Sequence, residues 1–253
     1  MSLFRPQRFA DGDHIEVAGA RVRLRVSGRA RRVSLRLDAI RGEIVATAPS
    51  PRRLNEAAAF AVERTAWVAA QMAQVPDPVR LAPGMVIEVL GRPVSLEAGA
   101  GRTRWRPADE ERIAALVVAG EGASYARGVV RALKLEARRV LTERTEAHAL
   151  AVGRPMPAVA IMDARARWGS CKPPRRSGFG ATAEVGRIRY SWRLVLAPVR
   201  VLDYVAAHEC AHLIEANHSP RFWAVVKELI GDHRPHRDWL RAHGPRLHAF
   251  GRD

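Results

Sequence analysis

The stretch HECAHLIEANH, residues 208–218, decides how the C-terminal part of the chain folds. His208 and His212 are four residues apart, about one helical turn, so both imidazoles lie on one face at a spacing that suits a single metal ion. Glu209 follows His208 by about 100° and lies along the edge of that face. Its carboxylate can take a proton from a metal-activated water without being a ligand. The pattern predicts a hydrolytic metal site on a helix.

A third ligand is needed, because catalytic zinc sites usually have three protein ligands and one position for water. His218 is the candidate, although on an unbroken helix it would lie about 240° past His212 and point away. The sequence predicts a break. Asn217 can adopt the left-handed conformation that ends helices, and Ser219 followed by Pro220 is a helix-start signature with serine as the cap. We therefore expect the chain to turn and carry His218 back to the metal.

Other interpretations of these residues stay open. HExxH also occurs by chance in helices, and the imidazoles would then be ordinary side chains. Glu228, on the predicted next helix, is an alternative third ligand. Zinc could also join the two helices without any catalysis.

The helix that carries the motif is predicted from apolar positions before it and from Pro198 at its first turn. Upstream, the 253-residue chain first shows strand patterns. In residues 21–26 and 32–38, apolar side chains alternate with arginine or serine, and residues 43–49 form a third run. These predict a small antiparallel sheet with one arginine-rich face. Residues 50–75 have helical spacing and predict a helix packed on that sheet.

Residues 83–120 indicate a further hairpin and additional strands. No internal repeat is evident. Residues 121–124 resemble a linker before a long helix over 124–152, which Gly153 and Pro155 end. We therefore predict an α+β fold with a domain boundary near residue 122. An antiparallel β-rich domain with a packed helix would span residues 1–122, and a helical domain would span 123–253.

Charge and cysteine content bear on partners and location. The formal charge of +16 would attract phosphates if it were clustered, but only three of the 42 cationic residues are lysines and the arginines are scattered. The two cysteines form no CxxC pair, which is typical of a reducing compartment. The start, MSLFRPQRFADGD, lacks a signal-peptide pattern, and no apolar run reaches the ~20 residues of a membrane span. We expect a cytoplasmic protein with no membrane partner.

Several other residues invite a chemical role. Ser170 and Cys171 follow a glycine in RWGSC, but GxSxG is absent, so we interpret the segment as a strand end whose turn borders the cleft and whose Trp168 packs in the core. Cys210 should be a small buried side chain. Candidates for stabilising an oxyanion are Arg167, Tyr190 and Tyr204. Phe222 and Trp223 should anchor the second helix, and we expect the tail histidines to be surface residues: His233, His236, His243 and His248.

The stretch from Arg167 to Leu240 resembles the YgjP-like metallopeptidases, a family of the zincin group that also includes SprT-like proteases. Four motifs carry the resemblance in the same order: RWGSC (167–171), the expected strand IRYSWRLVLAP (188–198), DYVAAHECAHL (203–213) and NHSPRFW (217–223). The resemblance implies a zincin-like fold, Zn²⁺ held by His208, His212 and His218, and Glu209 as the catalytic base.

The chain departs from the family pattern at two places. Tyr190-Ser191 stands where the family usually has an asparagine before the helix, and HRPHRDW, residues 233–239, replaces a stretch closer to Pro-Asp-Tyr. These departures concern substrate preference rather than the metal site.

The function expected from the sequence is that of a zinc-dependent metallopeptidase acting on peptides or proteins. The arginine content keeps two alternatives open: a zinc-dependent nucleotide phosphohydrolase, and an SprT-like protease that acts on DNA-bound proteins. Peptide, nucleotide and nucleic acid are thus the partners to distinguish. The sequence does not predict an oligomeric state.

Overall fold

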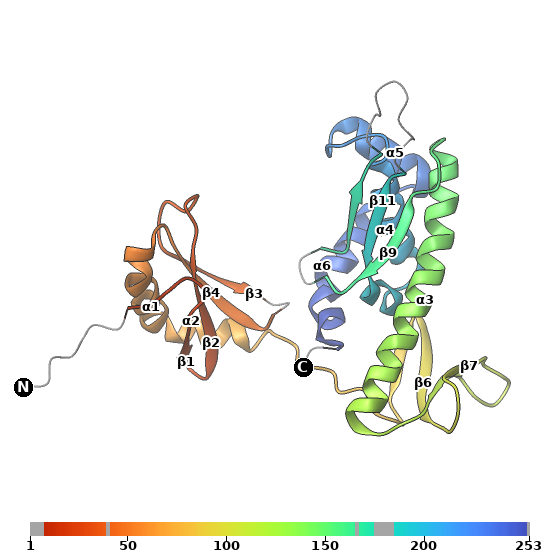
Figure 1. Ribbon diagram of the computed structural model, residues 1–253, viewed down its shortest axis with the longest axis horizontal. Coiled ribbons are helices and arrows are strands. Elements are labelled where there is room, and N and C mark those ends of the chain that lie inside the picture. Colours follow the sequence, from red (N-terminus) through yellow and green to blue (C-terminus); the bar gives the residue numbers. More distant parts are fainter. Residues whose placement is uncertain (1–7, 39–40, 165–166, 175–184, 252–253) are drawn as a thin grey trace, which may run out of the picture. The chain divides into compact units, whose positions relative to one another are not determined.

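The computed structural model describes residues 8–38, 41–164, 167–174 and 185–251. Its contacts divide the chain into two compact units, Met1–Asp77 and Pro78–Asp253, and each has its own hydrophobic core (Figure 1). The fold is mixed α/β, with sheets in the N-terminal half and six α-helices among the described residues. The first seven residues, where the absence of a signal-peptide pattern was noted, lie outside the described part.

The first unit is a four-stranded sheet covered by two helices. Strands β1 (His14–Val17), β2 (Ala20–Val26), β3 (Ser34–Asp38) and β4 (Glu43–Ala48) lie in the order β1-β2-β4-β3. A short 3₁₀ turn (Pro51–Arg53) leads to α1 (Leu54–Glu63) and α2 (Thr65–Met72), which pack on β2 and β4. The alternation of apolar residues predicted the strands correctly, because those residues form the core under the helices: Val22, Leu24, Ile44, Ala46, Leu54, Ala57, Ala61 and Val68.

The prediction of a purely antiparallel sheet is wrong. β1–β2 and β3–β4 are antiparallel, but β2 and β4 pair in parallel, so β4 lies between β2 and β3. Ile44, Val45 and Ala46 are all fully buried, and a strand that is apolar on both faces is most stable in the centre of a sheet. Residues 27–33 are therefore a connection around the central strand and not a hairpin turn.

The helical prediction for residues 50–75 is right in type and wrong in detail. The helix is interrupted at Arg64, where the Thr65 hydroxyl donates to the Val62 carbonyl at 2.5 Å. Val62 is 57% exposed and Trp67 is 36% exposed, although both lie on the apolar spacing. The interruption rotates α2 relative to α1, so only Val68 of α2 is buried.

The arginine-rich face of this sheet contains its own counter-charge. Glu43, almost fully buried on the central strand, accepts a hydrogen bond from Arg23 Nε at 2.8 Å and lies 3.7 Å from Arg41 and 3.8 Å from His14. The cations at the centre of this face are thus partly neutralised within the sheet.

The second unit begins with a sheet of the same topology. Strands β5 (Val86–Val89), β6 (Arg92–Ala98), β7 (Arg104–Arg106) and β8 (Ala114–Val118) lie in the order β5-β6-β8-β7, again with the second and fourth strands parallel. The strands expected from residues 83–120 are therefore confirmed.

The two sheets are an internal repeat, which the sequence interpretation missed. IEVAGARVRL (15–24) and IEVLGRPVSL (87–96) share Ile, Glu, Val, Gly, Val and Leu at matching positions. Both segments form the first hairpin of their sheet, with positive φ at both loop residues: Ala18 (51°) and Gly19 (71°), and Leu90 (54°) and Gly91 (77°). Positive φ at both positions is the type I′ geometry favoured in two-residue hairpins. The two sheets share their topology, but we find similar sequence only in these hairpins, so the repeat is difficult to detect from the sequence.

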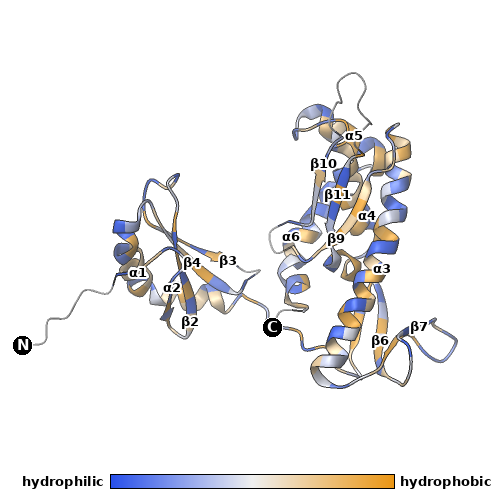
Figure 2. Cartoon of the chain, in the orientation of Figure 1, coloured by the Kyte–Doolittle hydropathy of each residue, from blue (hydrophilic) through white to orange (hydrophobic). Residues whose placement is uncertain are grey.

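Helix α3 (Gly122–Ala151) links this sheet to the rest of the second unit (Figure 1). Gly128 allows α3 to approach β8, because a Cβ there would lie 2.5 Å from Val118 Cγ1. The helix also packs on β9 and α4, and hydrophilic and hydrophobic residues alternate along it in Figure 2. The predicted boundary near residue 122 therefore falls inside the second compact unit, since α3 shares one core with the elements on both sides of that point.

A three-stranded sheet follows α3. β9 (Ala158–Met162) pairs in parallel with β11 (Arg187–Ser191), and β10 (Gly169–Lys172) pairs with β11 in antiparallel register, which places β10 at one edge. The strand expected over residues 188–198 ends at Ser191 and continues as a 3₁₀ turn, Trp192–Leu196. Helices α4 (Val199–Ala211), α5 (Pro220–Ile230) and α6 (Arg234–Ala249) complete the unit. None of the helices in the described ranges has the length and apolar content of a membrane span.

Candidate metal centre

Helix α4 carries the HExxH motif and is held firmly at its start. Its buried face includes Val201, Leu202 and Val205 and packs against α3. The tip of the β5–β6 hairpin contacts the segment before the helix, where Leu90 N donates to Val195 O at 2.7 Å. Next to it, a Cβ on Gly91 would lie 3.3 Å from the Pro198 backbone. The repeat hairpin therefore supports the helix that presents the site.

The helix ends at the motif itself. α4 stops at Ala211, His212 is its C-cap, and Leu213 N bonds to Cys210 O at 2.9 Å in a tightened last turn. Asn217 does not take the left-handed conformation that we expected. In the described ranges, the non-glycine residues with positive φ are Ala18 and Leu90. The break comes earlier and consists of consecutive turns, which need no left-handed residue.

The predicted start of the next helix is confirmed. Pro220 occupies the first turn of α5, and the Ser219 side chain accepts a hydrogen bond from Phe222 N at 3.3 Å. This cap satisfies an amide at the open end of α5 and sets the chain direction right after His218.

The turn brings the three histidines together. Their available ligand atoms all lie within 4.8 Å of one another. The ring centroids of His208 are 5.1 Å from His212 and 5.0 Å from His218, and those of His212 and His218 are 4.8 Å apart. His208 and His212 are half-buried and His218 is exposed. Within the described ranges this is the group of His, Cys, Asp or Glu side chains that could hold a metal ion, and Glu228 is not part of it.

The protonation of these imidazoles fits a cation. A carbonyl oxygen only accepts, so His212 Nδ1 must donate to Glu215 O, 2.9 Å away, which leaves Nε2 as the ring atom that can bind a metal ion. Burial and the neighbouring histidines lower the pKa of His208 to about 3, and burial and His212 lower the pKa of His218. The Nε2 atoms of His208 and His218 are only 3.1 Å apart. At this distance one ring can donate its N–H to the nitrogen of the other, and a bound cation would take the place of that contact. Three imidazole nitrogens are a donor set suited to zinc.

Phe222 is the packing centre of the cluster. Its fully buried ring lies 4.9 Å from His208, 4.5 Å from His212 and 4.7 Å from His218, measured between ring centroids. Trp223 is only partly buried and lies 5.8 Å from His218. Phe222 is thus the anchor that the sequence predicted, and it restricts all three rings at once.

Glu209 lies beside the histidines in a buried position. The residue is 5% exposed, and burial raises the pKa of its carboxyl to about 7 against the opposing effect of Arg167. Its carboxyl group lies against Gly169 of β10, where an added Cβ would be 2.4 Å from Oε1 and 2.6 Å from Cγ. A residue larger than glycine at this position would force the carboxyl group to move. Sequence reasoning missed this role, although Gly169 stands in the quoted RWGSC motif.

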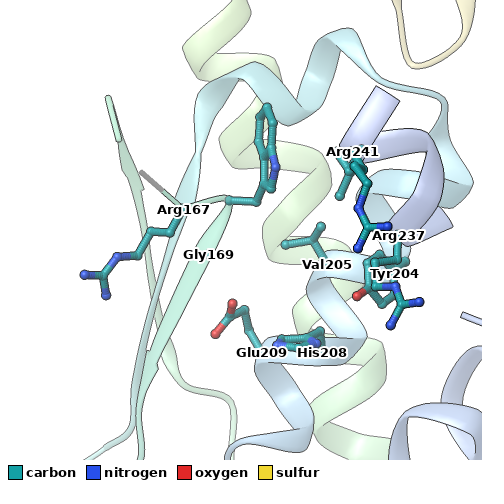
Figure 3. Close-up of a pocket in the computed structure, with 10 residues that line it drawn as sticks. Arg167, Gly169, Tyr204, Val205, His208, Glu209, Arg237 and Arg241 are labelled. Carbon is teal, nitrogen blue, oxygen red and sulfur yellow. The ribbon is translucent and has the colours of Figure 1, made fainter. Parts of the chain in front are cut away.

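His208 and Glu209 border a pocket of about 350 Å³. The pocket is formed by β10 with the residues before it, by α4 and by α6 (Figure 3). Trp168, Val205 and Leu240 provide apolar walls, and Tyr204 also lines the pocket. A substrate segment in this pocket would lie next to both His208 and the carboxyl group of Glu209.

The structure distinguishes between the three candidates for oxyanion stabilisation. Tyr190 is fully buried and its hydroxyl lies 2.9 Å from Thr145 Oγ1, so it faces the core and not the pocket. Tyr204 and Arg167 both line the pocket. The sequence could not distinguish these three residues because their distances to the motif depend on how β11, α3 and α4 pack.

The cysteines have the environment of inert thiols. Burial raises the pKa of both Cys171 and Cys210 to about 12, with a smaller contribution from neighbouring acidic groups. Cys210 is fully buried, as expected, and Cys171 lies in β10 next to Ser170. A thiol that stays protonated is a poor nucleophile, which agrees with the interpretation of RWGSC as a structural segment.

The tail histidines are less exposed than predicted. His248 is 5% exposed and stacks on Trp168 at 4.6 Å between ring centroids, so its assignment to the surface is wrong. His233 stacks on Trp223 and His243 on Trp239, each at 4.3 Å. Tryptophan rings before β10, on α5 and on α6 stack on these imidazoles, and the spacing of the histidines in the sequence does not predict these contacts.

A buried carboxyl group beside three converging imidazoles, with the carboxyl group and His208 lining a pocket, is the arrangement of a metal-dependent hydrolase. Comparison with protein families agrees with this class. The family described as YgjP-like, metallopeptidase domain, matches residues 31–243, so the chain belongs to the YgjP-like metallopeptidases and the resemblance seen in its motifs is confirmed. Membership implies a hydrolase with a metal ion and with peptide or protein substrates. No curated protein and no solved structure matches the chain.

Proposed function

We propose that the protein is a zinc-dependent peptidase with a zincin-like catalytic region within residues 123–253. His208, His212 and His218 hold the ion, and Glu209 is the general base. The observation that carries the proposal is the convergence of the three histidine ligand atoms within 4.8 Å, next to a carboxyl group that Gly169 admits to the pocket.

The donor set supports zinc over harder cations, because imidazole nitrogens suit zinc whereas Mg²⁺ and Ca²⁺ prefer oxygen ligands. Zinc bound at such a site polarises the scissile carbonyl and lowers the pKa of its water to ~7. All remaining steps belong to the side chains of the protein.

Glu209 is placed to move the proton. A carboxylate oxygen of Glu209 accepts a proton from the attacking water and returns it to the leaving amine. Burial makes this carboxylate more basic than an exposed glutamate, which brings its pKa of about 7 close to neutral pH. Tyr204 lines the same pocket and is the available donor to the carbonyl oxygen, whereas the guanidinium of Arg167 points away from Glu209 in Figure 3. The apolar walls limit water around the substrate.

The test pairs metal content with turnover. In Glu209→Gln, we expect the zinc content of the purified protein to stay at that of the wild type while kcat/KM on a peptide library falls about 10²- to 10⁴-fold, since general acid–base catalysis contributes about that much. Glu228→Gln is the matched control, because it removes an exposed glutamate outside the triad and should keep both properties.

Two results would refute the proposal. Full turnover in Glu209→Gln would remove this residue from the mechanism. Zinc content that is unaffected by His212→Ala would show that the ion binds elsewhere. Nucleoside triphosphates belong in the same screen, because their turnover in place of peptides would favour the phosphohydrolase alternative. A role for zinc as a purely structural link would appear as loss of folding on chelation with no turnover of any substrate.

A further inference from the structure

The pocket next to Glu209 is bordered by three arginines. Arg237 and Arg241 lie one turn apart on α6, and Arg167 precedes β10. Figure 3 shows Arg237 and Arg241 together on one side of the pocket, whereas Arg167 lies beside the strand with its guanidinium pointing away from them. This cluster has no part in the proton transfer assigned to Glu209.

The positive charge of the pocket is poorly compensated. Glu209 is the acidic residue among the side chains that line it. Arg237 Nε lies 3.7 Å from Asp238 on the same helix, whereas in the described ranges neither Arg241 nor Arg167 forms an ion pair. The guanidinium of Arg241 is therefore available to an anion from outside.

The size and the walls of the pocket suit a small anionic group on a larger molecule. A volume of about 350 Å³ accommodates one or two residues of a peptide, and Val205 and Leu240 offer apolar contacts to their methylene groups. Guanidinium groups bind carboxylates through paired hydrogen bonds, which are stronger in a partly desolvated pocket than on an open surface. The cluster also lies beside the groups assigned to catalysis, so a bound anion would fix the position of the bond to be cleaved.

We propose that this pocket recognises a carboxylate of the peptide substrate close to the scissile bond, with Arg241 as the main contact and Arg237 as its partner. The carboxylate is either an Asp or Glu side chain or the C-terminal carboxylate of the peptide. The inference rests on the proposed peptidase function, for which it names the substrate class.

The experiment uses matched quenched-fluorescent peptides and the full-length, metal-loaded protein. One pair of peptides differs only by Glu or Gln at a position next to the cleaved bond, scanned on both sides. A second pair differs only by a free or an amidated C-terminus. We expect the wild type to favour the carboxylate form by about 10- to 100-fold in kcat/KM, the range of a hydrogen bond to a charged group. The effect should lie in KM, because this contact is made equally in the bound substrate and in the transition state.

Variants of the pocket arginines test whether the preference for a carboxylate arises in this pocket. Arg241→Gln should lose most of it, and the double variant Arg237→Glu/Arg241→Glu should prefer peptides with Lys at the same position. Arg246→Gln is the control, because Arg246 is an exposed arginine of the same helix that does not line the pocket. The pair of peptides that carries the preference distinguishes a side-chain carboxylate from a C-terminal one.

Binding gives a readout that does not need turnover. In fluorescence anisotropy, a labelled acidic peptide should bind Glu209→Gln more tightly than the matched amide peptide does, and adding Arg241→Gln to that variant should remove most of the difference. Equal cleavage and equal binding of both peptide forms would overturn the inference while leaving the peptidase function intact. If no peptide is cleaved, the peptidase proposal fails and binding alone decides the carboxylate site. Stronger competition by inorganic phosphate or a nucleoside triphosphate than by acidic peptides would also overturn the inference.

Discussion

Replacing Gly169 with alanine should displace the carboxyl group of Glu209 without touching any proposed metal ligand. The added Cβ would lie 2.4 Å from Glu209 Oε1, 2.6 Å from Cγ and 2.7 Å from Cδ. Ordinary contacts begin at 3.4 Å, so the side chain or strand β10 must move by about 1 Å. Such a displacement of a catalytic group can cost about 10²-fold in rate, which corresponds to about 2.7 kcal/mol.

The assay is kcat/KM on a cleaved peptide, with zinc content and thermal unfolding measured on the same samples. Gly169→Ala should retain its metal and its fold and lose about 10²-fold in kcat/KM. Gly28→Ala is the control, because a Cβ at Gly28 meets no atom within 4 Å and the residue does not have positive φ. It should have wild-type activity.

A double-mutant cycle tests whether the loss acts through Glu209. In Glu209→Asp the carboxyl group withdraws by one methylene, so Gly169→Ala should add much less in this background than in the wild type. Full activity of Gly169→Ala, or an equal loss in both backgrounds, would refute the reasoning that β10 positions the catalytic carboxyl. Loss of metal would instead place the effect on the histidines.

Two further predictions concern stability. In metal-free protein, Glu209 titrates at about 7 when folded and at the ordinary 4.5 when unfolded, so its burial should cost the wild type about 3 kcal/mol of stability as pH rises from 4.5 to 7. Urea unfolding at several pH values should show that the free energy of unfolding of the wild type falls relative to that of Glu209→Gln as pH rises, while the histidine contributions common to both proteins cancel. Free energies of unfolding that follow the same pH profile in both proteins would contradict this prediction. Phe222→Ala should destabilise the protein by about 3–5 kcal/mol and weaken zinc binding, because the lost ring contacts all three histidines, whereas Phe222→Leu should lose much less of either. Unaltered zinc affinity in a folded Phe222→Ala protein would show that the ring does not hold the cluster.

The β5–β6 hairpin lies outside the site but contacts the segment that leads into helix α4. In the second unit, the tip at Leu90 and Gly91 contacts Val195 and Pro198, directly before helix α4. A residue larger than glycine at position 91 would combine a positive φ with a backbone contact at 3.3 Å. The hairpin thus supports the helix that carries the HExxH motif, whereas in its copy in the first unit a Cβ at Gly19 would have no atom within 4 Å.

The sequence by itself determined the parts of the site whose geometry is local. The four-residue spacing of His208 and His212 places both rings together on any helix, and Ser219-Pro220 starts a new helix wherever the chain allows one. The alternating strands and the long helix α3 were also predictable, since apolar periodicity reflects which face is buried. Even here the exact turn escaped prediction, because several conformations can end a helix and Asn217 was not needed for the one that formed.

Only the tertiary structure decided which distant residues meet the motif. Gly169 lies against Glu209, Arg237 and Arg241 face the same pocket, and Tyr190 turns its hydroxyl to Thr145, yet no spacing in the sequence distinguishes these outcomes. The central place of β4 and the common core across residue 122 were likewise undetermined. Each depends on how whole strands and helices pack, and that packing is a sum of many weak contacts between segments far apart in the chain, whereas a helical turn relates its neighbours through the backbone alone.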